Sequence, residues 1–483
     1  MTAADPIRAQ ARRTPEALAY VGHPRRIELT YAALDRLVDA VALRALAAGV
    51  QPGQTAIVAL AAPLAIAVTM VALARIGVAS AARTLPDRFA DVRLVAEASP
   101  GAAIREVVVH EDWFAAAPGA ASDRLPAPGG GAATWAIFGT SGTTGAPRHF
   151  AITHDMLARR VAIAARTVPM PALPRQLTRI GLQTAYGALR LISVLGAGGL
   201  VAFPEDRDVP ASLRARALNM LVMAPADIAR FLHLLPADAR AFPDLAVVVL
   251  AGSIVPRPLY DEIRARLCRC VRIAYGATEV GPTAGGTLDE LIDAPGAVGV
   301  VDRDCDVQCV DDDGRPVPPG AAGTIRIRRE PGAGIYLDDP AASLRAFRGE
   351  WFHPGDVGVL TADRRLRIVG RTDELINIGG DTLSPHAIEE RVLALGAVRE
   401  TAAFVVPDAQ GIPQPWIAVV PGPGLDLESL AARCTQAGAV PPGTRFVALP
   451  ALPRNAAGKV VRDELVRLVA ARGRDWPRAP TPP

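Results

Sequence analysis

The sequence predicts an α/β fold: a large N-terminal domain of helix-covered parallel sheets with a β-rich subdomain, and a small α+β C-terminal domain. Short apolar segments alternate with helical patterns from residue 134 to 274, which favours a parallel sheet. From residue 296 the pattern becomes β-rich, and Asp313-Gly314 is typical of a hairpin turn. A new αβ unit starts near Asp373. We therefore predict domains at residues 1–371 and 372–476, followed by a Pro-rich, disordered tail at 477–483.

The first 110 residues contain predicted helices and strands of a buried core. Residues 1–20 hold an amphipathic helix that ends near Thr14-Pro15, and Thr30 is a suitable N-cap for the next helix. Strands are predicted at residues 55–60 and 105–110. The apolar stretch 56–82 suggests a membrane span, but Pro63 and Arg75 interrupt it, so a core strand and helix are favoured.

Strands and helices alternate most regularly in the middle of the chain. A surface connection rich in Ala, Pro and Gly is expected at residues 115–133. Strands are predicted at residues 134–138, 180–183, 200–203, 220–223, 246–251 and 271–274. Helices are predicted at residues 155–166, 189–195, 211–218, 226–235 and 257–266. A second hairpin is predicted at residues 351–369.

Length, charge and cysteine content restrict the class of protein. At 483 residues the chain is too long for one compact core and indicates at least two domains. The formal net charge of +3, with basic residues spread evenly, argues against nucleic acid or an anionic membrane as a partner. Five cysteines and no signal peptide predict reduced thiols in the cytoplasm. A zinc site is the weaker alternative, because the spacings of these cysteines fit one poorly: Cys268, Cys270, Cys305 and Cys309.

The stretch 138–148, FGTSGTTGAPR, has the composition of a phosphate-binding loop. Its three glycines allow backbone N–H groups to approach an anion, and Arg148 adds a guanidinium suited to phosphate. Four hydroxyl side chains offer further donors: Thr140, Ser141, Thr143 and Thr144. It is not a Walker A loop, because no Gly-Lys-Ser/Thr follows the glycines. The alternative is a flexible linker, which the apolar strand at 134–138 argues against.

Three later motifs contain residues suited to nucleotide chemistry. Residues 275–281, YGATEVG, follow a predicted strand, at the edge where open α/β sheets bind ligands. Glu279 is suited to hold Mg²⁺ on phosphate oxygens, or is an exposed loop glutamate. Asp356 is suited to accept two ribose hydroxyls, or to cap its turn. Arg371 and Asp373, shortly before paired glycines, suit a hinge.

In this order, the motifs resemble the adenylate-forming superfamily of acyl-CoA synthetases, adenylation domains and luciferases. The resemblance covers nearly the whole chain. Further matching segments are RTPEALAY, LTYAALDRL, GVQPGQTAIVAL, DDDGRPVPPGAAGTIRIR, GEWFHPGDVG, GRTDELINIGG and PRNAAGKVVR. The resemblance implies a magnesium-dependent ligase that uses ATP to convert a small carboxylic acid to acyl-AMP with release of pyrophosphate. Transfer of the acyl group to CoA would follow.

The resemblance also implies roles for individual residues. The β- and γ-phosphates of ATP would lie against Thr140, Ser141, Gly142, Thr143, Thr144 and Gly145. Adenine would contact Gly252, Ser253, Tyr275 and Gly276. The ribose would bind Asp356 and Arg371, the α-phosphate would bind Thr278, and Mg²⁺ would bind Glu279. Asp373 would be the hinge of a mobile C-terminal lid.

Lys459 is the only lysine in the chain, beside 51 arginines. Either this is chance, or the position requires a compact ammonium that a guanidinium cannot replace. The resemblance implies that Lys459 bridges the α-phosphate and the substrate carboxylate. A cation is needed there, because two anions must approach each other as the carboxylate attacks phosphorus.

Three positions depart from the family pattern. Arg148 and Asn377 stand where lysines are usual, in the phosphate loop and after the hinge. In the acid-pocket segment 181–187, Thr184 replaces a histidine or aromatic residue, and Tyr186 and Gly187 complete the predicted pocket. The segment contains no aspartate to receive an α-amino group, which argues against an amino-acid substrate.

Two alternatives to a CoA ligase stay open. The first is a stand-alone adenylation enzyme that loads a carrier-protein phosphopantetheine. The second is a non-catalytic homologue that acts as a binding protein, and the presence of Glu279, Asp356, Arg371 and Lys459 argues against it.

Overall fold

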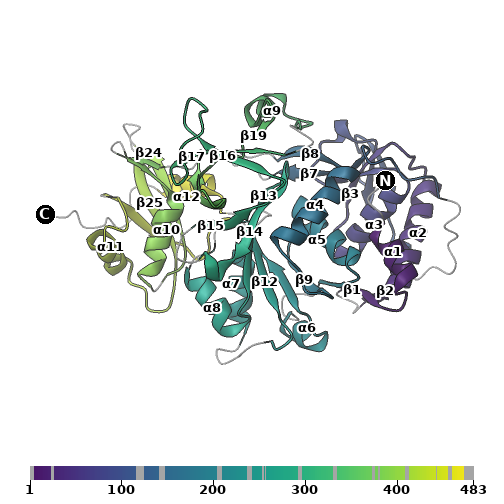
Figure 1. The fold of residues 1–483 in the computed structure, drawn as a ribbon, viewed down its shortest axis with the longest axis horizontal. Helices are drawn as coiled ribbons and strands as arrows, with labels where there is room; N and C mark the ends of the chain where they lie inside the picture. The colour runs from purple at the N-terminus through teal and green to yellow at the C-terminus, as the bar shows by residue number, and fades with distance from the viewer. Residues whose placement is uncertain are drawn as a thin grey trace.

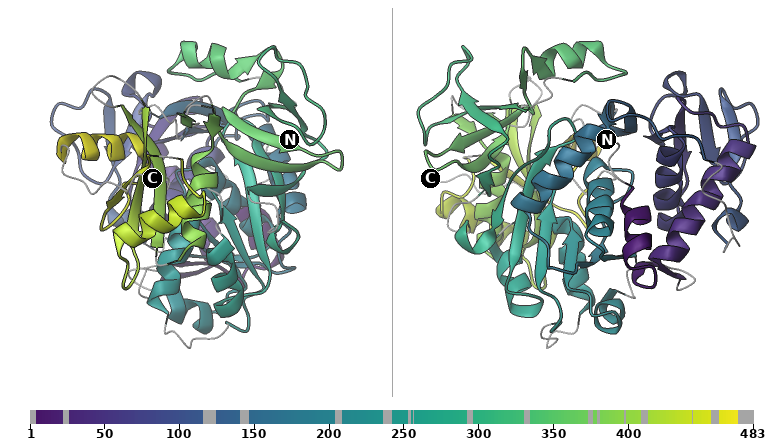
Figure 2. Two further views of the ribbon diagram at one scale, coloured as in Figure 1. Left: turned by 90° about the vertical axis from the view of Figure 1, so that its left-hand side faces the viewer. Right: turned by 45° about the vertical axis from the view of Figure 1, so that its right-hand side comes forward.

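Two large sheets and the helices between them make up most of the chain in the computed structural model (Figure 1). The structure describes residues 5–22, 27–115, 125–140, 147–203, 209–235, 242–252, 255, 257–291, 296–329, 334–372, 376–378, 381–396, 398–407, 413–441, 443–454 and 460–472. The N-terminal elements lie at one end of the molecule and the C-terminal elements at the other (Figures 1 and 2).

The first sheet has six strands, and all its neighbouring pairs are parallel except the last. Its order is β6 (Arg105–Val108), β5 (Val92–Val95), β3 (Thr55–Ala59), β4 (Ala79–Ala82), β7 (Thr134–Thr140) and β8 (Arg148–Thr153). In the antiparallel pair of β7 and β8, Thr140 lies opposite Arg148. The two ends of the predicted phosphate loop are therefore held side by side.

The apolar stretch that follows β3 is a core helix, α3 (Pro63–Arg75), and nearly every residue of it is buried. It packs beside α2 (Tyr31–Ala47), whose N-cap is Thr30 as predicted. Arg75 at the end of α3 pairs with three carboxylates, including Asp39 at 2.7 Å between Nη1 and Oδ1. Among the described residues, no helix has both the length and the apolar character needed to cross a membrane.

The second sheet begins as a parallel sheet and continues as an antiparallel one. Its parallel part contains β1 (Leu18–Gly22), β10 (Leu200–Phe203), β9 (Arg175–Thr178), β11 (Met220–Met223), β12 (Val247–Ala251) and β13 (Val271–Ala277), with β2 (Ile27–Thr30) at the edge. The helices of this region are α1 (Pro6–Arg13), α4 (His154–Thr167), α5 (Ala185–Gly196), α6 (Val209–Ala215), α7 (Pro225–Leu234) and α8 (Arg257–Arg266). Helices α4 and α5 lie between the two sheets (Figures 1 and 2).

The direction of the second sheet changes at β14 (Gly281–Thr287), which runs antiparallel to β13. Glycine is required at this reversal: a Cβ on Gly276 would lie 2.3 Å from the carbonyl oxygen of Gly281. Beyond it lie β15 (Ala297–Val301), β16 (Asp306–Val310), β17 (Ala322–Arg328), β18 (Phe347–Arg348), β19 (Trp351–Phe352), β20 (Asp356–Leu360) and β21 (Arg365–Arg371), with α9 (Pro340–Ala346). This is the predicted β-rich subdomain.

The C-terminal part has a separate three-stranded sheet: β24 (Val398–Pro407), β25 (Pro413–Pro421) and β26 (Arg445–Ala448). Around it lie the short pair β22 (Ile376–Ile378) and β23 (Asp381–Leu383), and the helices α10 (Pro385–Ala394), α11 (Leu427–Gln436) and α12 (Arg462–Arg472). Two clusters of buried apolar residues belong to this part alone. The boundaries that we predicted from the sequence stay predictions, and the tail at 477–483 lies outside the described residues.

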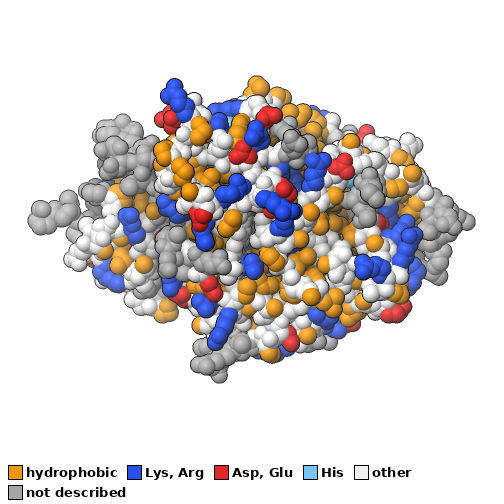
Figure 3. Space-filling model, in the orientation of Figure 1, with side chains coloured by type: hydrophobic (Ala, Val, Ile, Leu, Met, Phe, Trp, Pro, Cys, Tyr) orange, Lys and Arg blue, Asp and Glu red, His pale blue; other side chains and the backbone are white. Residues whose placement is uncertain are grey.

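The fold class predicted from the sequence is confirmed, and one predicted strand is wrong. Residues 180–183 form a turn, and the strand is β9 (Arg175–Thr178) instead. Apolar Ile180 and Leu182 favoured the wrong segment, whereas β9 contains the polar but buried Gln176. On the face shown in Figure 3, basic and acidic side chains are interspersed.

Glu389 on α10 connects the helices and the sheet of the C-terminal part. Its Oε1 accepts hydrogen bonds from Arg462 Nη2 at 2.7 Å and from the backbone N–H of Ala403 at 2.9 Å. Burial alone would raise the pKa of Glu389, but the charge of Arg462 and the bond with His386 lower it to about 2. A carboxyl with a depressed pKa in the folded state stabilises the fold above its unfolded pKa.

We predict that Glu389→Gln lowers the free energy of unfolding of the C-terminal part by about 1–3 kcal/mol at pH 7. The difference from the wild type should shrink as the pH falls from about 4.5 towards 2, because the wild-type carboxylate becomes protonated. Urea unfolding, followed by tryptophan fluorescence at several pH values, measures this difference in the free energy of unfolding. Glu390→Gln is the matched control, because burial raises the pKa of Glu390. Equal losses in both variants would contradict the role of Glu389.

Candidate active site

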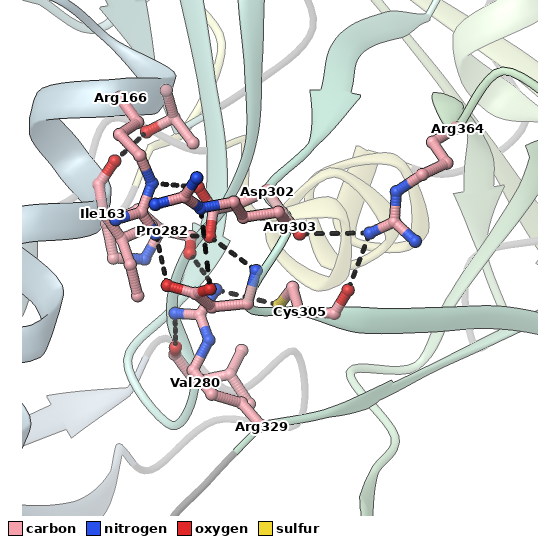
Figure 4. A network of polar contacts seen from close by, with 11 residues as sticks. Ile163, Arg166, Val280, Pro282, Asp302, Arg303, Cys305, Arg329 and Arg364 are labelled. Carbon is pink, nitrogen blue, oxygen red and sulfur yellow. Dashed lines mark hydrogen bonds and ion pairs between the residues drawn. The ribbon is translucent and has the colours of Figure 1, made fainter.

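A buried arginine, Arg160, and a half-buried one, Arg329, hold the backbone that follows β13. Arg160, from α4, donates from Nη1 to the carbonyl of Thr278 and from Nη2 to that of Glu279, both at 2.8 Å. Arg329 donates to the carbonyls of Val280 and Pro282, both at 2.6 Å (Figure 4). Burial, together with the charge of Arg329, lowers the pKa of Arg160 to about 9. These four bonds fix where the side chains of Thr278 and Glu279 begin.

The same network extends from Arg329 to the rest of the second sheet (Figure 4). Arg166 on α4 forms a bidentate pair with Asp302, with Nε–Oδ2 and Nη2–Oδ1 distances of 3.0 and 2.8 Å. Arg364 donates to the carbonyls of Asp302 and Cys305. Helix α4 is therefore tied both to the candidate site and to the connection between β15 and β16.

Glu279 is buried, with 8% of its surface exposed. Its Oε1 accepts a hydrogen bond from the Tyr336 hydroxyl at 2.7 Å, and none of the described residues forms an ion pair with it. Burial raises the pKa of Glu279, and the hydrogen bond from Tyr336 and the charges of Arg160 and Arg148 offset only part of that rise. A buried carboxylate in this condition fits Mg²⁺, which prefers oxygen ligands and brings the missing charge.

Arg148, at the end of the predicted phosphate loop, lies near Glu279 through Tyr336. Its guanidinium carbon lies 5.6 Å from the centroid of the Tyr336 ring, and its Nε lies 3.5 Å from Oδ2 of Asp339. The structure thus brings the loop end and the segment after β13 to the same tyrosine. Sequence reasoning missed Tyr336, Arg160 and Arg329.

Asp356 lies between Tyr275 and Arg371, two other residues of the predicted adenosine site. The Tyr275 hydroxyl donates to Oδ2 of Asp356 at 2.6 Å, and Arg371 Nη1 donates to Oδ1 at 2.9 Å. Arg371 Nη2 also donates to the carbonyl of Pro354. These bonds orient the Asp356 carboxylate between two side chains from β13 and β21. A carboxylate oriented in this way is suited to accept hydrogen bonds from hydroxyl groups.

The predicted acid-pocket residues all lie at the start of α5. Thr184 is its N-cap: Oγ1 accepts from the N–H of Gly187 at 3.1 Å and donates to the carbonyl of Gly181 at 2.7 Å. A Cβ on Gly187 would lie 2.2 Å from that same carbonyl oxygen, so the turn requires glycine. Thr184 and Gly187 thus have structural reasons to be present, and their pocket role stays a prediction. The hydroxyl of Tyr186 is buried and has no hydrogen-bond partner among the described residues.

Several predicted site residues lie outside the described part of the chain, and their roles stay predictions. They are Ser141, Gly142, Thr143, Thr144, Gly145, Ser253, Asp373 and Lys459. Gly252 is described: it follows β12 with a φ of +99° and has no atom within 4 Å of the position that a Cβ would take. The predicted zinc alternative has no support, because no group of three or more His, Cys, Asp or Glu side chains in the described ranges could hold a metal ion.

The model of the AMP-binding enzyme family matches residues 7–337. This chain belongs to that family. The prediction of an enzyme of the adenylate-forming superfamily is therefore confirmed. The match ends shortly after Tyr336, so it includes Thr278 and Glu279 but neither Asp356 nor the C-terminal part.

The curated relatives align with only part of this chain, and the chain aligns with only part of each relative. The indoleacetate–CoA ligase of Aromatoleum aromaticum is 28% identical over 69% of this chain and 67% of its own length. The human mitochondrial acyl-coenzyme A synthetase ACSM2A is 34% identical over 35% of this chain and 30% of its own length. The human mitochondrial acyl-coenzyme A synthetase ACSM2B is matched over 49% of its own length.

Solved structures cover nearly the whole chain. The o-succinylbenzoate CoA synthetase of Bacillus subtilis, in complex with an acyl-adenylate, has a TM-score of 0.81 at 21% identity, over 95% of this chain and 97% of that one. ATP-bound MatB from Rhodopseudomonas palustris also has a TM-score of 0.81 at 21% identity, over 97% and 99%. At this identity, the likeness confirms the fold.

We predict that Tyr275→Phe raises the KM for ATP about three- to ten-fold with a smaller effect on kcat, because Asp356 loses the tyrosine hydroxyl that helps to orient it. Steady-state kinetics or nucleotide calorimetry measures this. Tyr260→Phe is the matched control, because the Tyr260 hydroxyl on α8 also donates to an aspartate, Asp289, which is not one of the predicted site residues. If both variants change the KM equally, Asp356 has no special part in nucleotide binding.

Proposed function

We propose that this family member is an AMP-forming acid–thiol ligase. It joins a carboxylic acid to the α-phosphate of ATP, releases pyrophosphate, and transfers the acyl group of the resulting acyl-AMP to CoA. One observation carries the proposal: within a family of AMP-binding enzymes, a buried Glu279 that forms no ion pair with a described residue and the oriented Tyr275–Asp356–Arg371 trio lie on segments adjoining the carboxyl end of β13. Open α/β sheets bind their ligands at that edge.

Each residue would act on a different part of the nucleotide. The loop 140–145 and Arg148 would hold the β- and γ-phosphates, and Glu279 would hold Mg²⁺, which would neutralise phosphate charge. Thr278 would bind the α-phosphate, and Asp356 with Arg371 would bind the ribose. Gly252, Ser253, Tyr275 and Gly276 would line the adenine. These contacts would place the α-phosphorus where the acid carboxylate can attack in line with the leaving pyrophosphate.

The C-terminal part would close the site as a lid that turns about Asp373. Its separate sheet and its own buried apolar clusters support a body that can move as a unit. Lys459 would then enter between the α-phosphate and the acid. An ammonium suits that place, because the two anions leave little room for the wider guanidinium.

CoA is the acceptor that we favour over a carrier protein. In support, both the indoleacetate relative and the o-succinylbenzoate structure are described as CoA-dependent enzymes. One other relative, pseudomonine synthase PmsE of Pseudomonas entomophila, is 26% identical over 71% of this chain. Offering free CoA and a phosphopantetheinyl carrier side by side to the enzyme loaded with acyl-AMP discriminates the two acceptors.

We predict that the wild type exchanges labelled pyrophosphate into ATP when a panel of carboxylic acids is tested, and only in the presence of both an acid and Mg²⁺. This assay reports the first step alone. A chain that shows no exchange with any acid, yet binds ATP in calorimetry, would contradict the ligase and favour the binding-protein alternative.

We also predict that Lys459→Ala loses about 10²–10³-fold in pyrophosphate exchange while thiolysis of supplied acyl-AMP is retained. Lys459→Arg should be nearly as impaired, although it keeps the charge, because the guanidinium is wider. Stopped assays of the two half-reactions measure both effects. Equal loss of the two half-reactions in Lys459→Ala would remove the assigned role.

A further inference from the structure

Arg190 is buried on the inner side of α5, with 1% of its surface exposed. Its Nε and Nη2 donate to Oε1 of Gln176 at 3.1 and 2.9 Å, and Nη2 lies 3.1 Å from the sulfur of Met220. Among the described residues, no carboxylate pairs with this guanidinium and no acceptor bonds Nη1. A buried charge of this kind is costly unless another group compensates it.

Two further polar groups beside Arg190 lack partners. Gln176 is fully buried on β9, and its Nε2 donates to none of the described residues. The hydroxyl of Tyr186, one helical turn before Arg190, is buried and also lacks a hydrogen bond. Native proteins leave few buried polar groups unsatisfied, so three donors in one cluster indicate a missing acceptor.

Arg75 and Arg160, the two other arginines that are buried in the described part of the chain, are satisfied by the protein itself. Arg75 pairs with Asp5, Asp35 and Asp39. Arg160 donates to two carbonyls. Their environments show what a purely structural arginine receives in this fold, and Arg190 receives only a neutral amide oxygen and a thioether. The environment of Arg190 therefore lacks the carboxylate or backbone carbonyl acceptors that Arg75 and Arg160 have.

Strand pairing and apolar packing connect the region around Arg190 to the edge of the sheet where the nucleotide would bind. Strand register sets Gln176 beside Met220, and Met220 beside Val247. An apolar cluster runs from these strands, through Val222 and Val249, to Tyr186 and Ala274. Ala274 directly precedes Tyr275, whose hydroxyl orients Asp356. The cluster thus leads from Arg190 towards the edge where the nucleotide would bind.

We propose that Arg190, Gln176 and Tyr186 bind a second acidic group, a carboxylate, at the far end of the acid substrate. The inference rests on the proposed function. A carboxylate accepts the free guanidinium N–H groups, the amide Nε2 and the phenol hydroxyl, and neutralises the buried charge. This assigns the substrate class as dicarboxylic acids, with one carboxylate activated and the other held by Arg190.

The strand register also restricts the length of the substrate. Val247 lies one residue before Val248, which pairs with Val271, so Ala274 is four strand residues beyond the level of Gln176. Four extended residues span about 13 Å. An acid that reaches both ends must be elongated, with several carbons or a ring between its carboxylates, and malonate is too short.

The test compares decanoate with decanedioate, which have equal length and differ in the second carboxylate. In pyrophosphate exchange, the wild type should prefer decanedioate by about 100-fold in kcat/KM. Arg190→Met, which keeps the volume of the side chain and removes its charge, should prefer decanoate. Gln176→Leu should shift the preference in the same direction but less. Arg257→Met is the control and should behave as wild type, because Arg257 lies exposed on α8 and pairs with Asp261.

A second measurement does not depend on catalysis. Decanedioate without ATP should raise the melting temperature of the wild type more than decanoate does, and this difference should vanish in Arg190→Met. Equal shifts for the two acids in the wild type, or an unchanged preference in Arg190→Met, would overturn the proposal. Absence of exchange with every acid would instead contradict the ligase function, and the melting shifts would still decide about Arg190.

Discussion

This site depends on one constraint: a buried guanidinium needs hydrogen-bond acceptors. An arginine side chain stays charged and offers five N–H donors in a fixed plane, so its burial commits several oxygen atoms to fixed positions. Arg160 and Arg329 commit the carbonyls of Thr278, Glu279, Val280 and Pro282. The segment that we propose to bind phosphate and metal is therefore held in place through its backbone.

The change from a parallel to an antiparallel sheet explains why the site lies there. A parallel strand usually continues into a helix, but β13 turns back at once into β14, and the reversal leaves a short connecting segment at the carboxyl edge. The later antiparallel strands then deliver Asp356 and Arg371 to the same edge from about 80 residues further along the chain. Residues distant in sequence meet because one sheet joins both parts.

The sequence was sufficient for the fold class and for most of the elements, because strand and helix periodicity are local signals. Motif order put Tyr275, Asp356 and Arg371 in one predicted nucleotide site, and their roles there stay predictions. The sequence was insufficient for partners set by tertiary packing. Tyr336 has no local signal that separates it from any other tyrosine. Arg160 and Arg190 do have a local signal in the sequence, because each is a charged residue on the apolar face of a helix. Arg160 lies three residues after Leu157 on α4, and Arg190 lies four residues after Tyr186 on α5. Strand β9 was missed for a related reason. Its buried residue Gln176 is polar because it accepts hydrogen bonds from Arg190, and a buried polar residue weakens the apolar pattern of a strand.

Arg160 and Arg190 show how a structural arginine differs from a binding one. Both are buried on adjoining helices, α4 and α5, that lie between the two sheets. Burial lowers the pKa of both guanidinium groups. Arg160 receives two carbonyl oxygens and lies near the Glu279 carboxylate, so the fold compensates its charge. Arg190 has no backbone carbonyl acceptor and no carboxylate among the described residues. Hydrophobic replacement of an uncompensated buried charge often stabilises a protein. A charge that stability alone does not favour is better explained by a ligand that completes it.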